Sequence, residues 1–341
     1  MDRSSAVARR RPPLEFADCC QDRTEFANRV AATVLLDALG RGDVVHALDD
    51  VSLTVAPGET LGLVGESVCG KSALARIIMR LHEPTAGSVT FAGTDIAKAG
   101  SRRLRALRRD MAMIFQDPYA SLNPRRTVFD IVAEPLRIHR LADGRELKIK
   151  VNALLEVVGL NAEHARRYPH EFSGGQRQRI GIARALSTSP RLVICDEPVS
   201  ALDVSIQAQV LNLLRDLKDE LGLTLVFIAH DLGVVRHVSD RIAVMYLGRI
   251  VEIATPDNLF SAPRHPYSEA LLAAVPVPDP ALAAARLADH VAVEGEVPSP
   301  ISPPSGCHFH PRCRFATDVC SATAPALSAL DGRVVACHHP R

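Results

Sequence analysis

The chain has 341 residues, of which 47% are hydrophobic and 23% charged, and a net charge of +1. This is the composition of a globular protein with one to three domains, and its near-zero charge excludes bulk electrostatic attraction to nucleic acid or anionic lipid. No apolar run reaches the roughly 18 residues of a membrane helix, and the first residues lack the apolar core of a secretory signal. We therefore expect the eight cysteines to lie in a reducing compartment, as free thiols or metal ligands rather than disulfides.

Strands and helices are predicted to alternate along the middle of the chain. Residues 60–64 form a short apolar strand, and residues 74–81 follow with apolar side chains at helical spacing. Two further buried strands are predicted at 191–195 and 223–229, separated by a helix. This alternation predicts an α/β fold with a mainly parallel sheet and with phosphate chemistry at the strand ends.

Composition divides the chain into three segments. Residues 1–30 are rich in arginine and without a clear period, so we expect weak structure there. Residues 31–262 carry the α/β pattern, with a helical subdomain at about 118–190. Proline becomes dense from residue 263 onward, which indicates a separate loop-rich extension over 263–341.

The segment Gly65–Ser72 matches G-x-x-x-x-G-K-[ST], a phosphate-binding loop, or P-loop. A strand precedes it and a helix follows, so successive backbone N–H groups and a helix start are expected to face phosphate oxygens. Lys71 is expected to reach the β- and γ-phosphates of ATP, and the Ser72 hydroxyl to bind Mg²⁺. The nucleotide contacts predicted here are Gly65, Glu66, Ser67, Cys69, Gly70, Lys71, Ser72 and Ala73.

Val68 is unusual in such a loop, because this position commonly holds glycine, which tolerates a positive φ. A β-branched residue fits a positive φ poorly. Two interpretations stay open: the loop tolerates valine, or it binds nucleotide weakly.

A second acidic and polar set follows the P-loop. Asp196 and Glu197 end a predicted strand, where Asp196 can hold Mg²⁺ and Glu197 can polarise the attacking water. His230 ends the next strand, where a γ-phosphate sensor is expected. Gln116 carries a neutral side chain that could contact both Mg²⁺ and the water. We predict Glu197, His230 and Gln116 as the catalytic residues.

Ser173, Gly174, Gly175 and Gln176 open a predicted helix that forms a second anion-binding start. One nucleotide needs only one P-loop, so this second site is expected to serve the nucleotide of a partner. That implies a head-to-tail dimer with two ATP molecules at its interface. Asp203, shortly after the acidic pair, is predicted as a further nucleotide contact.

These motifs, in this order, resemble those of the ATP-binding subunits of ABC transporters. Gln116–Pro124, Pro169–Arg184, Glu197–Leu211, Arg264–Leu272 and Pro298–Cys307 resemble oligopeptide and dipeptide importers, most of all the second, F-type subunit. The resemblance implies a second homologous ATPase, two membrane permease subunits, indirectly an extracytoplasmic solute-binding protein, and a peripheral position on the cytoplasmic face of the inner membrane. It also implies peptide import, with nickel open as the solute because nickel importers share these motifs.

One departure from the family concerns the adenine. The family usually begins with a strand and an aromatic residue that stacks on the base, and residues 15–43 show neither cleanly. His46 is a candidate substitute.

Four cysteines near the C-terminus, Cys307, Cys313, Cys320 and Cys337, form a set that can hold metal. Four thiolates suffice for an iron–sulfur cluster or a zinc site, and a small proline-rich unit gains from such a staple. Within the family, the extension is associated with a 4Fe–4S cluster, so we rank iron–sulfur ahead of zinc, with free thiols as the alternative. The neighbouring histidines, expected to be solvated, are His308, His310, His338 and His339.

The sequence disfavours two other classes of function. Arginines between Arg102 and Arg109 form a basic run, but no aromatic residues interleave, so a solvated helix face is expected and no nucleic-acid partner. A soluble ABC ATPase of DNA repair or translation is disfavoured by the peptide-importer tail. The sequence thus predicts an ABC-type ATPase that drives solute import, with a catalytically weak partner subunit as the alternative.

Overall fold

The computed structural model describes residues 28–38, 43–274 and 295–341, and side chains from residue 44 onward. The predictions for residues 1–27, including Cys19 and Cys20, lie outside these ranges. Within them, no helix combines the length and hydropathy needed to cross a bilayer.

The central sheet carries the site. Its eight strands lie in the order β11-β12-β10-β9-β3-β8-β7-β6. Their bounds are β3 Thr60–Val64, β6 Met111–Ile114, β7 Leu192–Asp196, β8 Thr224–Ile228, β9 Arg241–Tyr246, β10 Arg249–Ala254, β11 Ser328–Leu330 and β12 Arg333–Val335. The five strands from β9 to β6 are parallel, and β10, β12 and β11 continue the sheet antiparallel. Buried on both faces, the inner parallel strands read as continuous apolar runs, as predicted.

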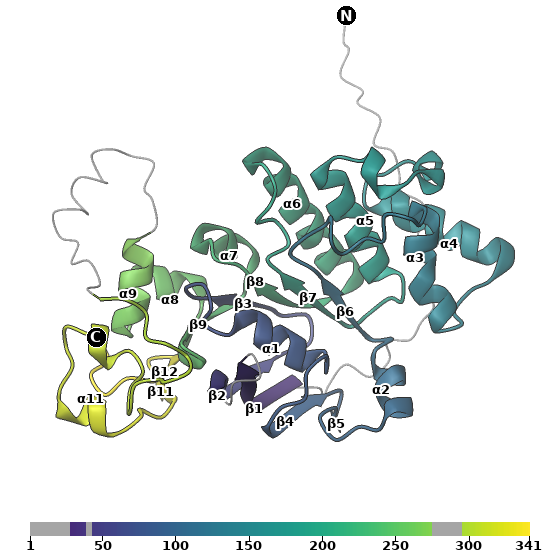
Figure 1. Ribbon diagram of the computed structural model, residues 1–341. Coiled ribbons are helices and arrows are strands. Elements are labelled where there is room, and N and C mark those ends of the chain that lie inside the picture. Colours follow the sequence, from purple (N-terminus) through teal and green to yellow (C-terminus); the bar gives the residue numbers. More distant parts are fainter. Residues whose placement is uncertain (1–27, 39–42, 275–294) are drawn as a thin grey trace, which may run out of the picture.

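A smaller antiparallel sheet lies beside it, in the order β2-β1-β4-β5. Its strands are β1 Asn28–Ala38, β2 Asp43–Val55, β4 Ala86–Phe91 and β5 Thr94–Asp95. Helix α1, Lys71–Ile78, packs between the two sheets, where its Leu74 and Ile77 are fully buried (Figure 1). The helix ends at Ile78, three residues before the end of the apolar stripe predicted over 74–81, and Leu81 is half-exposed. Strand β1 shows that the segment before residue 43 does form the strand that its sequence did not indicate.

Helices gather at one end of the molecule and the C-terminal extension at the other (Figure 1). The helical end holds α3 Val128–Ile138, α4 Gly144–Val157, the short helices η1 Ala162–Arg166 and η2 Pro169–Glu171, and α5 Gly174–Leu186. The remaining helices are α2 Ser101–Leu107, α6 Val204–Leu221, α7 Leu232–Val238, α8 Pro256–Ser261, α9 Pro266–Ala273, η3 His310–Arg312 and α11 Asp318–Ala322.

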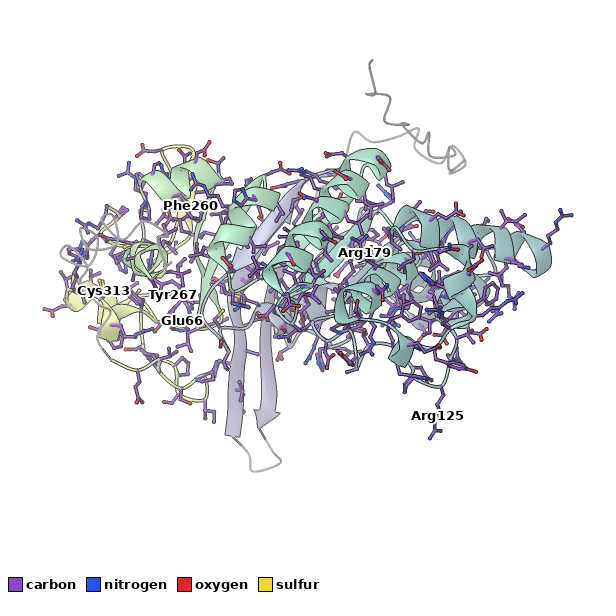
Figure 2. The ribbon with its side chains drawn as sticks, turned by 90° about the horizontal axis from the view of Figure 1, so that it is seen from above. Glu66, Arg125, Arg179, Phe260, Tyr267 and Cys313 are labelled. Carbon is purple, nitrogen blue, oxygen red and sulfur yellow. The ribbon has the colours of Figure 1, made fainter. Side chains whose placement is uncertain are left out.

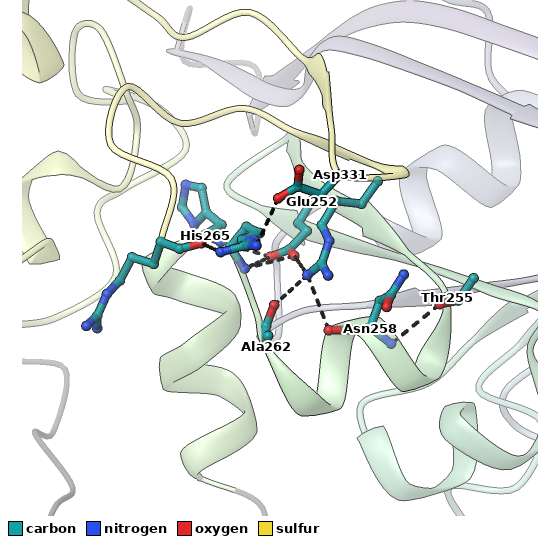
Figure 3. Close-up of polar contacts among 9 residues, drawn as sticks. Glu252, Thr255, Asn258, Ala262, His265 and Asp331 are labelled. Atoms are coloured by element: carbon teal, nitrogen blue, oxygen red, sulfur yellow. Dashed lines mark hydrogen bonds and ion pairs between the residues drawn. The ribbon is translucent and has the colours of Figure 1, made fainter.

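The extension is part of the main sheet rather than a unit beside it. Its hairpin β11–β12 pairs with β10 through Glu252 and Ile253. Glu252 is fully buried and accepts hydrogen bonds from the backbone N–H groups of Arg264 and His265, at 3.0 and 2.9 Å, where the chain turns into α9 (Figure 3). The extension is thus attached by backbone pairing and by a buried carboxylate.

Candidate active site

The P-loop joins β3 to α1, as predicted. Gly65 and Gly70 have φ of 155° and 103°. A Cβ at Gly65 would lie 2.1 Å from the carbonyl oxygen of Met245, and one at Gly70 would lie 2.3 Å from that of Ala47. Close backbone packing therefore requires both glycines, in addition to their dihedral angles.

The Lys71 ammonium lies inside this loop and is buried. It donates to the carbonyl oxygens of Gly65 and Glu66, at 2.8 and 2.9 Å, and lies 3.6 Å from the Cys69 sulfur. A cation enclosed by loop carbonyls is placed to exchange them for phosphate oxygens. Among the other predicted contacts, Ser67 is exposed, while Ser72 and Ala73 lie in the first turn of α1.

Val68 adopts a φ of 66° and leaves 81% of its side chain exposed. The backbone at this position is thus in the left-handed region that favours glycine, as the sequence suggested. A β-branched residue there stores about 1–3 kcal/mol of strain.

The first acidic residue meets the P-loop. The Ser72 hydroxyl donates to the Asp196 carboxylate at 3.0 Å, across 124 residues of sequence. Burial raises the pKa of Asp196, the hydrogen bond from Ser72 lowers it, and the charge of Glu197 raises it further. A hydroxyl beside a carboxylate is the hard-oxygen donor set that Mg²⁺ prefers, so these residues fit the predicted metal site.

Glu197, the second acidic residue, contacts the other two predicted catalytic side chains. Gln116 donates its amide to Glu197 at 2.7 Å, and the His230 Nδ1 lies 3.6 Å from the same Glu197 oxygen. Glu197 itself has a φ of 47° and its side chain is 17% exposed, whereas that of His230 is 59% exposed. Three predicted catalytic side chains therefore meet at one carboxylate oxygen, next to the Ser72–Asp196 pair.

The predicted partner-facing residues form a separate group at the start of α5. Ser173 caps the helix in a reciprocal box with Gln176. Gly174 and Gly175 lie against Leu202 and Ile206 of the segment around Asp203. Among the hydrogen bonds of the described residues, none joins Ser173–Gln176 to the P-loop of the same chain.

The four tail cysteines line a single pocket together with His265, His310, His338, His339 and Phe309. Burial, followed by the charges of the other three thiols, raises the pKa of Cys337 to about 11, opposed by a backbone hydrogen bond. Among the described residues, no group of three or more His, Cys, Asp or Glu side chains has the spacing of a metal site. His308 is buried and bonds the Leu247 carbonyl oxygen at 2.9 Å, so the expectation that it is solvated was wrong.

Sequence reasoning missed two residues that contact the P-loop from the extension. Tyr267 accepts a hydrogen bond from the Glu66 N–H at 2.9 Å, and Arg312 pairs with the Glu66 carboxylate at 3.1 Å. His46, proposed to lie at the adenine, donates its backbone N–H to the Pro300 carbonyl oxygen at 2.9 Å. The extension therefore lies against both the P-loop and β2.

Comparison with protein families matches residues 48–200 to the ABC transporter model and residues 251–320 to the C-terminal region of oligopeptide/dipeptide transporters. A probable peptide ABC transporter ATP-binding protein of Sinorhizobium fredii is 59% identical, over 86% of this chain and 83% of that protein. The oligopeptide transport ATP-binding protein OppF of Escherichia coli is 54% identical, over 86% of this chain and 87% of its own.

Solved structures of ATP-binding cassettes resemble this chain in fold. An ATP-binding cassette solved as a dimer in a post-hydrolysis state, with ADP and phosphate bound, superposes with a TM-score of 0.61. It is 29% identical and covers 67% of this chain and 98% of its own.

Proposed function

Because the chain belongs to the ATP-binding subunits of oligopeptide and dipeptide ABC transporters, we propose that it hydrolyses ATP to drive peptide import through a membrane permease. The observation that carries this proposal is the meeting of Gln116 and His230 at Glu197, beside the Ser72–Asp196 pair. The names of the relatives favour peptides over nickel as the solute.

Each residue has a chemical task in this reaction. Lys71 and the P-loop N–H groups hold the phosphates, and Ser72 with Asp196 would hold Mg²⁺, which neutralises phosphate charge. Glu197 accepts a proton from the attacking water, while Gln116 orients that water. His230, more exposed than Glu197, contacts the γ-phosphate.

The proposed assembly rests on the residues at the start of α5, which share no hydrogen bond with the P-loop among the described residues. Ser173–Gln176 completes the nucleotide site of a second, homologous ATPase, so that ATP closes a head-to-tail pair. The solved cassette with ADP and phosphate bound is itself a dimer, which supports pairing of two such subunits. Two permease subunits and a solute-binding protein complete the importer, and the chain lies peripherally on the cytoplasmic face of the membrane.

The proposal is tested with Glu197→Gln in the assembled transporter. Loss of the general base lowers ATP hydrolysis about 10²- to 10⁴-fold while nucleotide binding persists. Asp216→Asn removes an exposed carboxylate of α6 and serves as the matched control. Unchanged hydrolysis and transport with Glu197→Gln would contradict the proposal.

A second candidate, a catalytically weak partner subunit, is favoured by the strained φ of Val68. In that case Glu197→Gln leaves transport almost unchanged, whereas Ser173→Ala abolishes it because Ser173–Gln176 serves the partner's ATP. The same pair of variants therefore separates the two candidates.

We also propose that the tail cysteines hold an iron–sulfur cluster, with zinc as the alternative. Support comes from the four thiols that line one pocket and from the small core of a proline-rich unit. Among the described residues these thiols do not stand at the spacing of a metal site, so the cluster requires them to move together. Iron, acid-labile sulfide and zinc contents of anaerobically purified protein, compared with Cys320→Ala, test this. Equal contents in the two proteins would exclude a cysteine-held metal.

A further inference from the structure

We propose that Arg312 and Tyr267 of the C-terminal extension are positioning residues of the nucleotide site, which hold the P-loop in its phosphate-binding shape. This inference rests on the proposed function, since it concerns the binding of ATP by this same loop. Figure 2 shows Glu66, Tyr267 and Cys313 at one end of the molecule, far from Arg125 and Arg179 of the helical subdomain.

Tyr267 fixes the backbone at the start of the loop. Its hydroxyl accepts the hydrogen bond from the Glu66 N–H at 2.9 Å, and its side chain is 1% exposed. The ring packs against Tyr246 and Phe309, with centroids 4.6 and 5.4 Å apart. Because this aromatic cluster locks the ring, the hydroxyl is a fixed point from which the loop departs.

Arg312 fixes the Glu66 side chain. Its Nη1 lies 3.1 Å from Glu66 Oε2 and 3.4 Å from the Tyr246 hydroxyl, and its side chain is 9% exposed. Arg312 ends η3, directly before Cys313 of the cysteine pocket. The shape of the cysteine-rich unit thus sets where this guanidinium lies.

Two features of the loop require such anchors. Glu66 places a carboxylate in a loop that receives a triphosphate, and the two like charges repel unless a cation neutralises the carboxylate. Val68, two residues further on, holds a strained φ of 66°, and strained residues persist only where their surroundings over-determine them. Gly70, packed on Ala47, fixes the C-terminal end of the loop, and the extension fixes the N-terminal end through Glu66.

The experiment measures binding of a fluorescent ATP analogue with Mg²⁺ to the full chain. We expect Arg312→Ala to weaken binding about tenfold, as loss of a charged hydrogen-bonded pair does, and Tyr267→Phe, which removes only the hydroxyl, to weaken it less. Arg314→Ala is the matched control. Arg314 lies two residues along the same unit and pairs with Glu269 instead, so binding stays unchanged.

A double-mutant cycle and hydrogen exchange distinguish a positioning role of Arg312 at the P-loop from a general contribution to the stability of the fold. If Arg312 acts through Glu66, then Arg312→Ala made in a Glu66→Gln background no longer weakens binding. Exchange of the amides between residues 60 and 72 rises in Arg312→Ala, while amides of α5, at the other end of the molecule, stay protected.

The outcomes are distinct. Equal binding by wild type, Arg312→Ala and Tyr267→Phe overturns this inference and leaves the proposed function standing. A penalty of the same size in the Glu66→Gln background, with exchange raised throughout the chain, overturns it as well. Failure of the wild-type chain to bind the analogue overturns both the inference and the proposed function.

Discussion

At the scale of single residues, Val68 gives the sharpest prediction. Its Cβ branches at a φ of 66° with 81% of the side chain exposed, so the strain is not offset by burial. Val68→Gly removes about 1 kcal/mol of strain after allowance for the greater freedom of glycine in the unfolded chain. We expect the melting temperature to rise by about 1–2 °C for a chain of 341 residues, measured by calorimetry.

The matched control is Val68→Ala, which keeps a Cβ at the positive φ and recovers only part of the gain. ATP affinity, measured on the wild type and both Val68 variants, tests whether the chain is a catalytically weak partner subunit. Improved stability with unchanged affinity supports a working ATPase, whereas a large gain in affinity favours the weak partner. A melting temperature that does not change would show that the loop accommodates valine without strain.

Residue types and motif order were enough to predict one site that holds Ser72, Asp196, Gln116, Glu197 and His230, although not the direct contacts between these side chains. Each lies at a strand end or helix start whose place in a parallel sheet follows from the fold class. The partners of Glu66 were not predictable. Tyr267 and Arg312 lie 201 and 246 residues further along the chain, and no periodic pattern links them to the loop.

At the scale of elements, the packing of α5 on α6 depends on Gly175. A Cβ there would lie 2.3 Å from Cγ2 of Ile206, and a β-branched side chain on a helix has little rotamer freedom to yield. We expect Gly175→Ala to push the start of α5 away from α6, destabilise the fold by about 1–3 kcal/mol, and reduce ATPase activity of the assembled transporter. Urea denaturation and the activity assay measure the two effects.

Gly181, in the middle of the same helix, provides the control. A Cβ there meets no atom within 4 Å, so Gly181→Ala is expected to stabilise α5 by about 0.5–1 kcal/mol through helix propensity alone. If Gly175→Ala and Gly181→Ala changed the stability by the same amount, the contact with Ile206 would not affect the packing of α5 on α6.

Elements with a strong period were predictable, and short or irregular ones were not. The buried strands β7 and β8 came within one or two residues of the predicted ranges. Strand β1 was missed because its sequence, read alone, does not alternate strictly between apolar and polar residues. Its place is set by pairing with β2 and β4 on either side.

At the scale of the whole molecule, proline density predicted an appended unit, whereas the structure joins the extension to the main sheet. The hairpin strands β11 and β12 have three residues each, too few for a period to show. The extension is therefore connected to the active site in two ways. One is the sheet itself, and the other is the contact of Arg312 and Tyr267 with the P-loop.

The attachment of the extension depends on one buried charge. Glu252 has no exposed surface, and Arg333, 6% exposed, lies 3.9 Å from it while donating to the carbonyl oxygens of Asn258 and Ala262 (Figure 3). Arg333→Met leaves the carboxylate buried without its countercharge, and breaking a buried pair on one side costs about 3–5 kcal/mol. We therefore expect a large fall in the urea midpoint.

A second substitution, at Glu252, distinguishes the loss of charge pairing from the loss of side-chain packing. Glu252→Gln together with Arg333→Met removes both charges and keeps an acceptor for the backbone N–H groups of the turn, so the double variant recovers much of the stability. Arg126→Met breaks an exposed pair with Glu134, 45% and 43% exposed, and is expected to cost less than about 1 kcal/mol. Should Arg333→Met cost no more than Arg126→Met, pairing of β12 with β10 would suffice to hold the extension, and the buried carboxylate would have no part in the attachment.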